Sequence, residues 1–274
     1  MTNRKRIACF FTGGYTELNA MKGFLQKINP QADYIQLCPT GRRRSKRDIM
    51  GRHINAMDPE QNGLTGKALL DHMLSFLGSN RFQEEGYDAI LIEDDRDDRF
   101  LSLRSDGSSH IDRAAWEKFQ QDVRSQVEQY APGVPVLFIL AAPEVESWFI
   151  ADWEHGFGQA FRSFFSHSSP QHYKFFRGKL RRYVNETILT SCYQDRIEEY
   201  GYFDSIYRKL SAQFQAALAE EALFEGYPGE EEPPTLSYSK RTQGEDMLWS
   251  LEPQQVLRHC PLFFKDGFLT LKNL

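Results

Sequence analysis

Residues 6–17 read R-I-A-C-F-F-T-G-G-Y-T-E, a short apolar run that ends at two glycines and a polar turn. A continuous apolar run bounded by turn residues is typical of a buried strand. Comparable runs occur at residues 88–92 (D-A-I-L-I) and 135–141 (P-V-L-F-I-L-A), and residues 34–38 form a fourth, weaker one. The sequence therefore predicts four buried strands.

Apolar residues at helical spacing separate these strands. Helices are predicted from Thr16 to the Asn29-Pro30 stop, over residues 69–77, over residues 115–127, and from Glu144 to Asp152. Residues 41–52, between the second strand and the second helix, are predicted as a loop or a solvated helix end. Strands that alternate with helices, without tight hairpins, favour an α/β fold with a parallel sheet covered on both faces.

The strand signal fades after about residue 155. An i, i+4 stripe of apolar residues then predicts a further helix; its members are Ile206, Leu210, Phe214, Leu218 and Ala222. We therefore expect an α/β domain over residues 1–155 and a mainly helical lobe over residues 156–274.

Composition excludes several classes of protein. Of the 274 residues, 41% are hydrophobic and 14% aromatic, which supplies a core and argues against disorder. The longest uncharged apolar stretch, residues 133–143, is far shorter than the ~20 residues that cross a bilayer. The four cysteines are scattered without a C-x-x-C pair, so we expect a cytoplasmic protein without a disulfide framework or a zinc ribbon.

Charge is distributed unevenly along the chain. The formal net charge is −5, yet residues 1–56 contain 11 Lys and Arg against 3 Asp and Glu. Two basic segments are candidate nucleic-acid contacts, one at residues 42–47 and one, interleaved with aromatics, at residues 172–183. The candidate residues are Arg42, Arg43, Arg44, Lys46, Arg47, Lys174, Arg177, Lys179, Arg181 and Arg182. The alternatives are a solvated loop for the first segment and an amphipathic helix burying Phe175, Phe176 and Leu180 for the second.

Carboxylates follow three of the predicted strands. Glu17 follows the first, the run at residues 93–98 follows the third, and Glu144 and Glu146 follow the fourth. Carboxyl ends of parallel strands share one edge of a sheet, where such folds place their sites. Carboxylates gathered there need a cation, and oxygen ligands suit Mg²⁺ or Mn²⁺. The alternatives are a helix-start residue for Glu17 or Glu144 and a solvated loop for the charged run.

Three motifs carry a family resemblance. F-T-G-G-Y-T-E (11–17), L-I-E-D-D-R-D-D (91–98) and A-P-E-V-E-S-W-F-I-A-D (142–152) together resemble the Toprim-like nucleases. They are most similar to the small stand-alone family related to the overcoming-lysogenization-defect nucleases, many of which are bacterial defence components. The resemblance covers about residues 6–155 and implies a Toprim-like sheet. It also implies metal ligands at Glu17, Asp95, Asp97, Glu144 and Glu146, and places Asp152 in the third motif.

A late lysine is typical of these nucleases, and Lys240 in Y-S-K-R is the best candidate. The resemblance thus implies a catalytic set of Glu17, Asp95, Asp97, Glu146 and Lys240, although an ordinary surface lysine is the alternative for Lys240. One position departs from the family pattern. Gly13 stands where the family has an acidic residue, so Glu17, Glu93 or Asp94 must compensate or catalysis is impaired.

Together these observations predict a divalent-metal-dependent nuclease that hydrolyses DNA or RNA in prokaryotic defence or repair. Metal-bound water would attack the phosphodiester. The alternative, motivated by Gly13, is a catalytically impaired subunit that binds nucleic acid or a partner, with an ATPase and a second copy of the chain as further candidate partners. A third interpretation, a nucleotide-binding signalling domain, rests only on the glycine turn.

Overall fold

The computed structural model describes residues 4–47, 53–228 and 232–274, and it leaves out the side chains of residues 42–56. The chain forms two compact units. The sheet unit contains the described residues of Met1–Asp95 with Arg113–Ala141 and Pro261–Leu274, and the helical unit contains Arg96–Asp112 and Ala142–Cys260. The units are thus discontinuous in sequence, whereas the sequence analysis placed a single boundary after residue 155.

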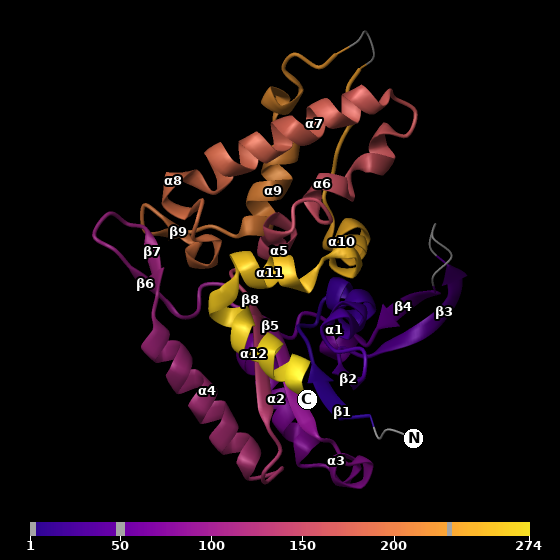
Figure 1. Cartoon of the computed structure of the whole chain (residues 1–274), viewed down its shortest axis with the longest axis vertical. Helices are drawn as coiled ribbons and strands as arrows, with labels where there is room; N and C mark the ends of the chain where they lie inside the picture. Colours follow the sequence, from indigo (N-terminus) through magenta and orange to yellow (C-terminus); the bar gives the residue numbers. More distant parts are fainter. Residues whose placement is uncertain (1–3, 48–52, 229–231) are drawn as a thin grey trace. The chain divides into compact units, whose positions relative to one another are not determined.

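A four-stranded parallel sheet forms the centre of the sheet unit (Figure 1). Its strand order is β2-β1-β5-β8. The strands are β1 (Arg6–Phe10), β2 (Asp33–Cys38), β5 (Ala89–Asp95) and β8 (Val136–Ala141). All of β5 and β8 is buried, as continuous apolar strands in a parallel sheet require. The predicted α/β class and its four strands are confirmed.

Helices flank this sheet. They are α1 (Lys22–Ile28, preceded by the π-helical turn η1, Glu17–Met21), α2 (Gly66–Leu77), α3 (Asn80–Glu85), α4 (Arg113–Glu128) and α12 (Pro261–Asn273), with a 3₁₀ turn η2 (Pro59–Gln61). Right-handed crossovers place α1 on one face of the sheet and place α2 and α4 on the other, because β2 and β5 lie on opposite sides of β1. One ring contact shows α2 packing on the sheet: the ring centroids of Phe76 in α2 and Phe10 in β1 lie 5.9 Å apart.

The strand order creates a switch point between β1 and β5. From β1 the chain moves outward to β2, and it then returns to the far side of β1 to form β5. In open α/β sheets the crevice at the carboxyl ends of the strands beside such a switch point is where ligands bind. The segments that follow β1 and end β5 therefore occupy the position favoured for a site.

Residues 41–57 differ from the prediction. They contain an antiparallel hairpin of β3 (Gly41–Arg47) and β4 (His53–Met57), with Gly41 opposite Met57. The predicted loop or helix end is wrong for residues 41–47, whereas residues 48–52 lie outside the described residues. R-R-R-S-K-R has no apolar alternation that would indicate a strand, and its strand conformation comes from backbone pairing with β4.

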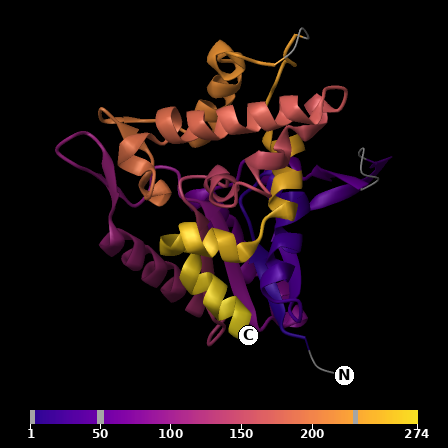
Figure 2. The same ribbon diagram turned by 45° about the horizontal axis from the view of Figure 1, so that its top comes forward.

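The helical unit contains most of the remaining helices (Figure 2). They are α5 (Glu146–Ala151), α6 (Phe157–Ala160), η3 (Arg162–Phe165), α7 (Pro170–Tyr183), η4 (Val184–Ile188), α8 (Thr190–Tyr193), η5 (Ile197–Glu199), α9 (Leu210–Leu218), η6 (Glu221–Phe224), η7 (Lys240–Gly244), α10 (Glu245–Ser250) and α11 (Pro253–His259). The predicted stripe is only partly helical. Ile206 lies 63% exposed in a short hairpin of β9 (Tyr202–Phe203) and β10 (Ile206–Tyr207). Leu210, Phe214 and Leu218 are buried in α9, whereas Ala222 lies exposed in η6.

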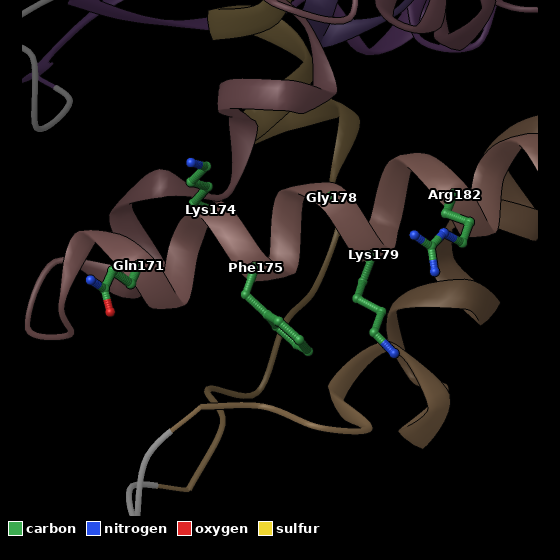
Figure 3. A pocket seen from close by; sticks show the side chains of 6 residues that line it. All are labelled: Gln171, Lys174, Phe175, Gly178, Lys179 and Arg182. Atoms are coloured by element: carbon green, nitrogen blue, oxygen red, sulfur yellow. The ribbon is translucent and has the colours of Figure 1, made fainter.

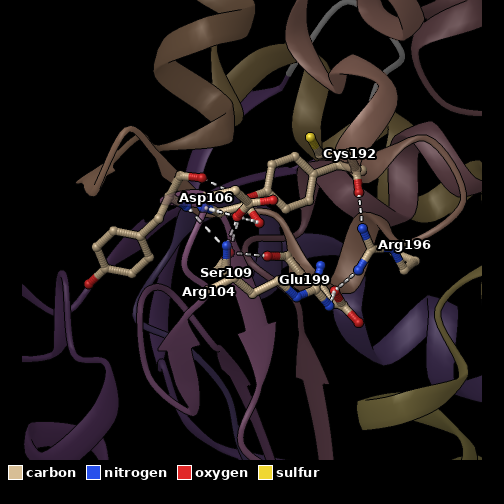
Figure 4. Close-up of polar contacts among 9 residues, drawn as sticks. Arg104, Asp106, Ser109, Cys192, Arg196 and Glu199 are labelled. Atoms are coloured by element: carbon tan, nitrogen blue, oxygen red, sulfur yellow. Dashed lines mark hydrogen bonds and ion pairs between the residues drawn. The ribbon is translucent and has the colours of Figure 1, made fainter.

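A polar network fixes a second hairpin, β6 (Leu101–Leu103) and β7 (Ser109–Ile111), within the helical unit (Figure 4). Ser109 Oγ donates to the Glu199 carbonyl at 2.5 Å, and Arg104 Nη2 lies 2.9 Å from Glu199 Oε2. Arg196 also pairs with Glu199 and donates to the Cys192 carbonyl. These bonds explain why residues 96–112 belong to the helical unit. Among the described residues no helix is both long and apolar enough to span a membrane.

Helix α12 packs on β8 at one glycine. A Cβ added to Gly267 would lie 2.3 Å from the Phe138 carbonyl oxygen, whereas a Cβ added to Gly178 of α7 would meet nothing within 4 Å. The first contact is with backbone and cannot be relieved by a side-chain rotation. The two helical glycines therefore have opposite structural roles.

We expect Gly267→Ala to lower the free energy of unfolding by about 1–3 kcal/mol, as overpacking does. Gly178→Ala is the matched control and should raise it by about 0.5–1 kcal/mol, because alanine favours the helix. Urea denaturation followed by circular dichroism measures both. Equal effects of the two variants would contradict the packing of α12 on β8.

Candidate functional site

The charged run that follows the third predicted strand begins inside that strand. Glu93, Asp94 and Asp95 are the last residues of β5, and their exposed fractions are 0%, 4% and 8%. The end of β5 extends past β1; it pairs with β8 on one side, and Thr12, after β1, donates its backbone N–H to the Glu93 carbonyl on the other. The alternative of a solvated loop is wrong for these three residues.

Asp94 anchors the start of α2. Its carboxylate accepts hydrogen bonds from Thr65 Oγ1 at 2.7 Å, from the Gly66 backbone N–H at 2.9 Å and from Thr12 Oγ1 at 3.0 Å. A carboxylate at a helix N-terminus accepts from otherwise unsatisfied N–H groups and interacts favourably with the helix dipole. Both oxygens of Asp94 are therefore engaged in holding the fold.

Glu93 has a different environment. Thr12 N–H donates to Oε2 at 3.3 Å, but the buried Oε1 has no hydrogen-bond partner among the described residues. Burial, followed by the charges of Glu17, Asp95 and Asp94, raises the pKa of Glu93 well above its ordinary value. At the end of β5 this carboxyl group therefore requires either a proton or a cation.

Glu17 joins this group from the segment after β1. It lies in the first turn of η1, is 3% exposed, and its charge acts on Glu93. A Cβ on Gly14 would lie 1.9 Å from Glu17 Oε2, so the absence of a side chain at Gly14 gives the carboxylate its space. Single π-helical turns of this kind are frequent at functional sites.

The backbone of residues 61–64 packs directly against Gly13. The Gly13 N–H donates to the Leu64 carbonyl at 2.7 Å, and its carbonyl accepts from Gly63 N–H at 2.8 Å. An added Cβ would lie 2.1 Å from the Gln61 carbonyl oxygen. The packing of residues 61–64 therefore leaves no space for a side chain at this position. Of the three candidates to compensate for the missing acidic residue, Asp94 is engaged structurally, which leaves Glu17 and Glu93.

A second carboxylate group lies in the helical unit. Glu146, fully buried in the first turn of α5, accepts a hydrogen bond from Tyr238 Oη at 2.7 Å. Lys240 Nζ lies 3.2 Å from Glu146 Oε2 and 3.4 Å from Glu144 Oε1. Lys240 is therefore part of the carboxylate group, not an ordinary surface lysine.

The two glutamates of this group have opposite pKa shifts. Burial acts to raise the pKa of Glu144, but Lys240 and the hydrogen bonds from Ser211 outweigh it, so the pKa lies below its ordinary value. Burial also raises the pKa of Glu146, and there Lys240 and Tyr238 do not fully offset it. Glu144 is thus held as a carboxylate, with Ser211 at the start of α9 as its anchor.

Asp97 lies beside this group with a strained backbone. Its φ of +52° is in the left-handed region, and its N–H donates to the Pro143 carbonyl at 2.8 Å. Its carboxylate lies 3.2 Å from Lys209 Nζ. Burial lowers the pKa of Lys209, but the charges of Asp97 and Glu144 outweigh that effect and raise it. Two lysines thus balance the carboxylates of the helical unit.

The structure therefore divides the predicted residues between two groups. Glu17 and Asp95 lie in the sheet unit, whereas Asp97, Glu144, Glu146 and Lys240 lie in the helical unit. Across the described residues, no three His, Cys, Asp or Glu side chains are arranged to hold a metal ion. Sequence reasoning missed Lys209 and Ser211, because neither carries a motif. It named Glu93 only as a substitute for Gly13, although its place in an apolar strand was a usable signal.

Asp152, which matches the third motif, supports the fold. Its Oδ2 accepts the Glu252 backbone N–H at 2.7 Å, directly before α11, and its carboxylate lies 3.0 Å from His155 Nδ1. These contacts give Asp152 a structural role.

The second basic segment forms α7, which buries Phe176 and Leu180. Arg177 and Arg181 lie 3.2 and 3.8 Å from Glu154. The remaining candidates, Lys174, Lys179 and Arg182, line a groove with Phe175 (Figure 3). The amphipathic-helix alternative is confirmed for Phe176 and Leu180 but not for Phe175, which is only partly buried.

The first basic segment lies in β3, but its side chains fall outside the described residues. This applies to Arg42, Arg43, Arg44, Lys46 and Arg47.

Comparison of the chain with protein-family models, curated proteins and solved structures finds no match.

The raised pKa of Glu93 predicts a pH dependence of stability. Below the unfolded pKa of about 4.5 the group is protonated in both states and costs nothing. Above that pH the unfolded chain ionises first, so stability falls by about 1.4 kcal/mol per pH unit until the folded pKa is reached.

We expect Glu93→Gln, which keeps an acceptor for Thr12 N–H, to match the wild type at pH 4 and to be more stable at pH 7. Urea denaturation in EDTA at both pH values measures the difference. If the free energy of unfolding of Glu93→Gln differed from that of the wild type by the same amount at pH 4 and at pH 7, the raised pKa of Glu93 would be contradicted.

Proposed function

We propose that this chain is a divalent-metal-dependent phosphodiesterase that hydrolyses DNA or RNA, with a Toprim-like sheet unit. One observation carries the proposal: Glu93 is fully buried at the switch point, its Oε1 has no described hydrogen-bond partner, and Glu17 and Asp95 act on it electrostatically. Such a group is favoured when a cation neutralises it.

The donor chemistry fits a hard divalent cation. Glu17, Glu93 and Asp95 would supply carboxylate oxygens, which suit Mg²⁺ or Mn²⁺. Because the described residues contain no ready metal group, these side chains would have to turn toward the ion when it binds. A bound divalent ion activates water and stabilises phosphoryl oxygens. Of the residues expected to bind metal, Asp97, Glu144 and Glu146 are instead balanced by lysines, so we leave them out of the ligand set.

Lys240 is the proposed phosphate-binding residue. Its side chain is 37% exposed while Glu144 and Glu146 hold its ammonium group. A lysine fixed in this way would contact a phosphate oxygen of the bound nucleic acid and neutralise its charge. Tyr238 would position Glu146, and Glu146 would position Lys240.

The biological setting in this proposal, prokaryotic defence or repair, rests on the three sequence motifs. Their resemblance to the stand-alone nucleases related to the overcoming-lysogenization-defect family supports it.

A second candidate function is a non-enzymatic subunit that binds nucleic acid or a partner such as an ATPase. The packing around Gly13 favours it, because no side chain can replace the acidic residue of the family there. This candidate predicts binding that needs no divalent ion and no turnover.

Cleavage by purified protein separates the two candidates. We expect the wild type with Mg²⁺ or Mn²⁺ to cleave at least one of supercoiled plasmid, single-stranded DNA and total tRNA. Glu93→Gln and Glu146→Gln should each lose roughly 100-fold or more in rate, as loss of a group that stabilises the transition state does.

The control is Asp71→Asn, which removes an exposed carboxylate paired with Lys67 on α2. It should change the rate by less than about twofold, since surface substitutions have small effects. Nucleic-acid binding in EDTA with no cleavage under any condition would favour the second candidate. Equal cleavage by Glu93→Gln and wild type would overturn the metal assignment.

A further inference from the structure

The cations of α7 differ in their ion pairing. Arg177 and Arg181 are directed to Glu154, which neutralises part of their charge. Lys174, Lys179 and Arg182 form no ion pair with any carboxylate of the described residues. The helix itself, P-Q-H-Y-K-F-F-R-G-K-L-R-R-Y, contains no Asp or Glu. The side of α7 that bears these three residues is therefore a positive face, whose charge no described carboxylate neutralises.

A groove lies along that positive face (Figure 3). Its volume is about 420 Å³, and its lining residues are Gln171, Lys174, Phe175, Gly178, Lys179 and Arg182. Gly178 leaves a gap in the middle of the face, because a Cβ there would meet nothing within 4 Å. The groove thus has a cationic border and an open centre.

Phe175 is a rigid aromatic surface inside the groove. Tyr227 meets its ring edge-on with centroids 6.1 Å apart, and Lys179 Nζ lies 5.6 Å from the ring centroid. Figure 3 shows Phe175 and Lys179 projecting from the same side of α7. Its neighbour Phe176 is buried and anchors the helix through ring contacts with Phe165 and Phe224. An aromatic ring beside a cation, in a groove lined by further cations, is the kind of surface on which unpaired bases stack.

We propose that this groove binds single-stranded nucleic acid, with a base stacked on Phe175 and phosphates at Lys174, Lys179 and Arg182. Duplex nucleic acid fits less well, because its bases are already stacked and offer no free face to the ring. An acidic peptide would use the cations but not the aromatic face. The inference shares with the proposed function only the choice of nucleic acid, and it requires no catalysis.

Fluorescence anisotropy with a labelled 20-mer of dT in EDTA tests the groove without cleavage. The triple variant Lys174→Gln/Lys179→Gln/Arg182→Gln should bind about tenfold or more weakly, and its salt slope should fall by about 2, since each single-strand contact contributes about 0.7. The matched control on the same helix is Arg177→Gln/Arg181→Gln. It should bind within about threefold of the wild type, because Glu154 partly neutralises these arginines.

Two further variants test shape and stacking with the charge unchanged. Gly178→Leu fills the open centre, favours the helix, and should weaken binding about tenfold or more. Phe175→Leu keeps an apolar side chain and should weaken binding about tenfold, whereas Phe175→Tyr should preserve it. Thermal melting followed by circular dichroism checks that each variant is folded.

Three results would overturn the inference. The first is wild-type affinity in the folded Gly178→Leu and triple variants. The second is equal affinity for the 20-mer of dT and for its duplex with dA, which would show that no base stacks on Phe175. The third is equal affinity for a 20-residue polyglutamate, which would make the groove a docking site for acidic peptides. The binding assay contains EDTA and so does not depend on cleavage. A protein that binds the 20-mer in this assay but cleaves no substrate with Mg²⁺ or Mn²⁺ would refute the nuclease proposal and leave this inference standing.

Discussion

Repulsion among carboxylates at the buried end of β5 is the constraint on which the candidate site of the sheet unit depends. The last residues of β5 are Glu93, Asp94 and Asp95, and all three are buried, paired with β8 and next to the segment that follows β1. The turn after β1 adds Glu17 to the same group. Burying like charges costs free energy unless hydrogen bonds, protons or cations compensate, and the structure shows a different compensation for each member.

Asp94 is compensated by hydrogen bonds, and these bonds connect β1, α2 and β5. Thr12 is central to this arrangement, because its hydroxyl donates to Asp94 and accepts from the Asp95 backbone N–H. Glu93 receives only one weak backbone bond, so its charge is left for a proton or a cation. In the helical unit the compensation comes from lysines, and Glu144 is held charged by Lys240 and Ser211. The two carboxylate groups therefore differ in how their charge is compensated.

The sequence was sufficient to predict the parallel sheet, because the strands after residues 6, 88 and 135 are continuous apolar runs with helical segments between them. It predicted the helix through Leu18, Met21 and Ile28 and its end at Asn29 for the same reason. It did not predict the hairpin at residues 41–57 or the division of the chain into two discontinuous units, since both depend on tertiary pairing. Nor did it show that Gly13 is clamped by residues 61–64, because that contact joins segments about 50 positions apart. The role of Lys209 was likewise invisible, since only its distance to Asp97 identifies it.

The measurement that tests the central claim most directly is calorimetric titration of Mn²⁺ into the intact protein at pH 7. If Glu93 is a metal ligand, the wild type binds Mn²⁺ and Asp71→Asn binds it with the same affinity, whereas Glu93→Gln shows no binding. Absence of binding by the wild type, or equal binding by the wild type and Glu93→Gln, would contradict the account.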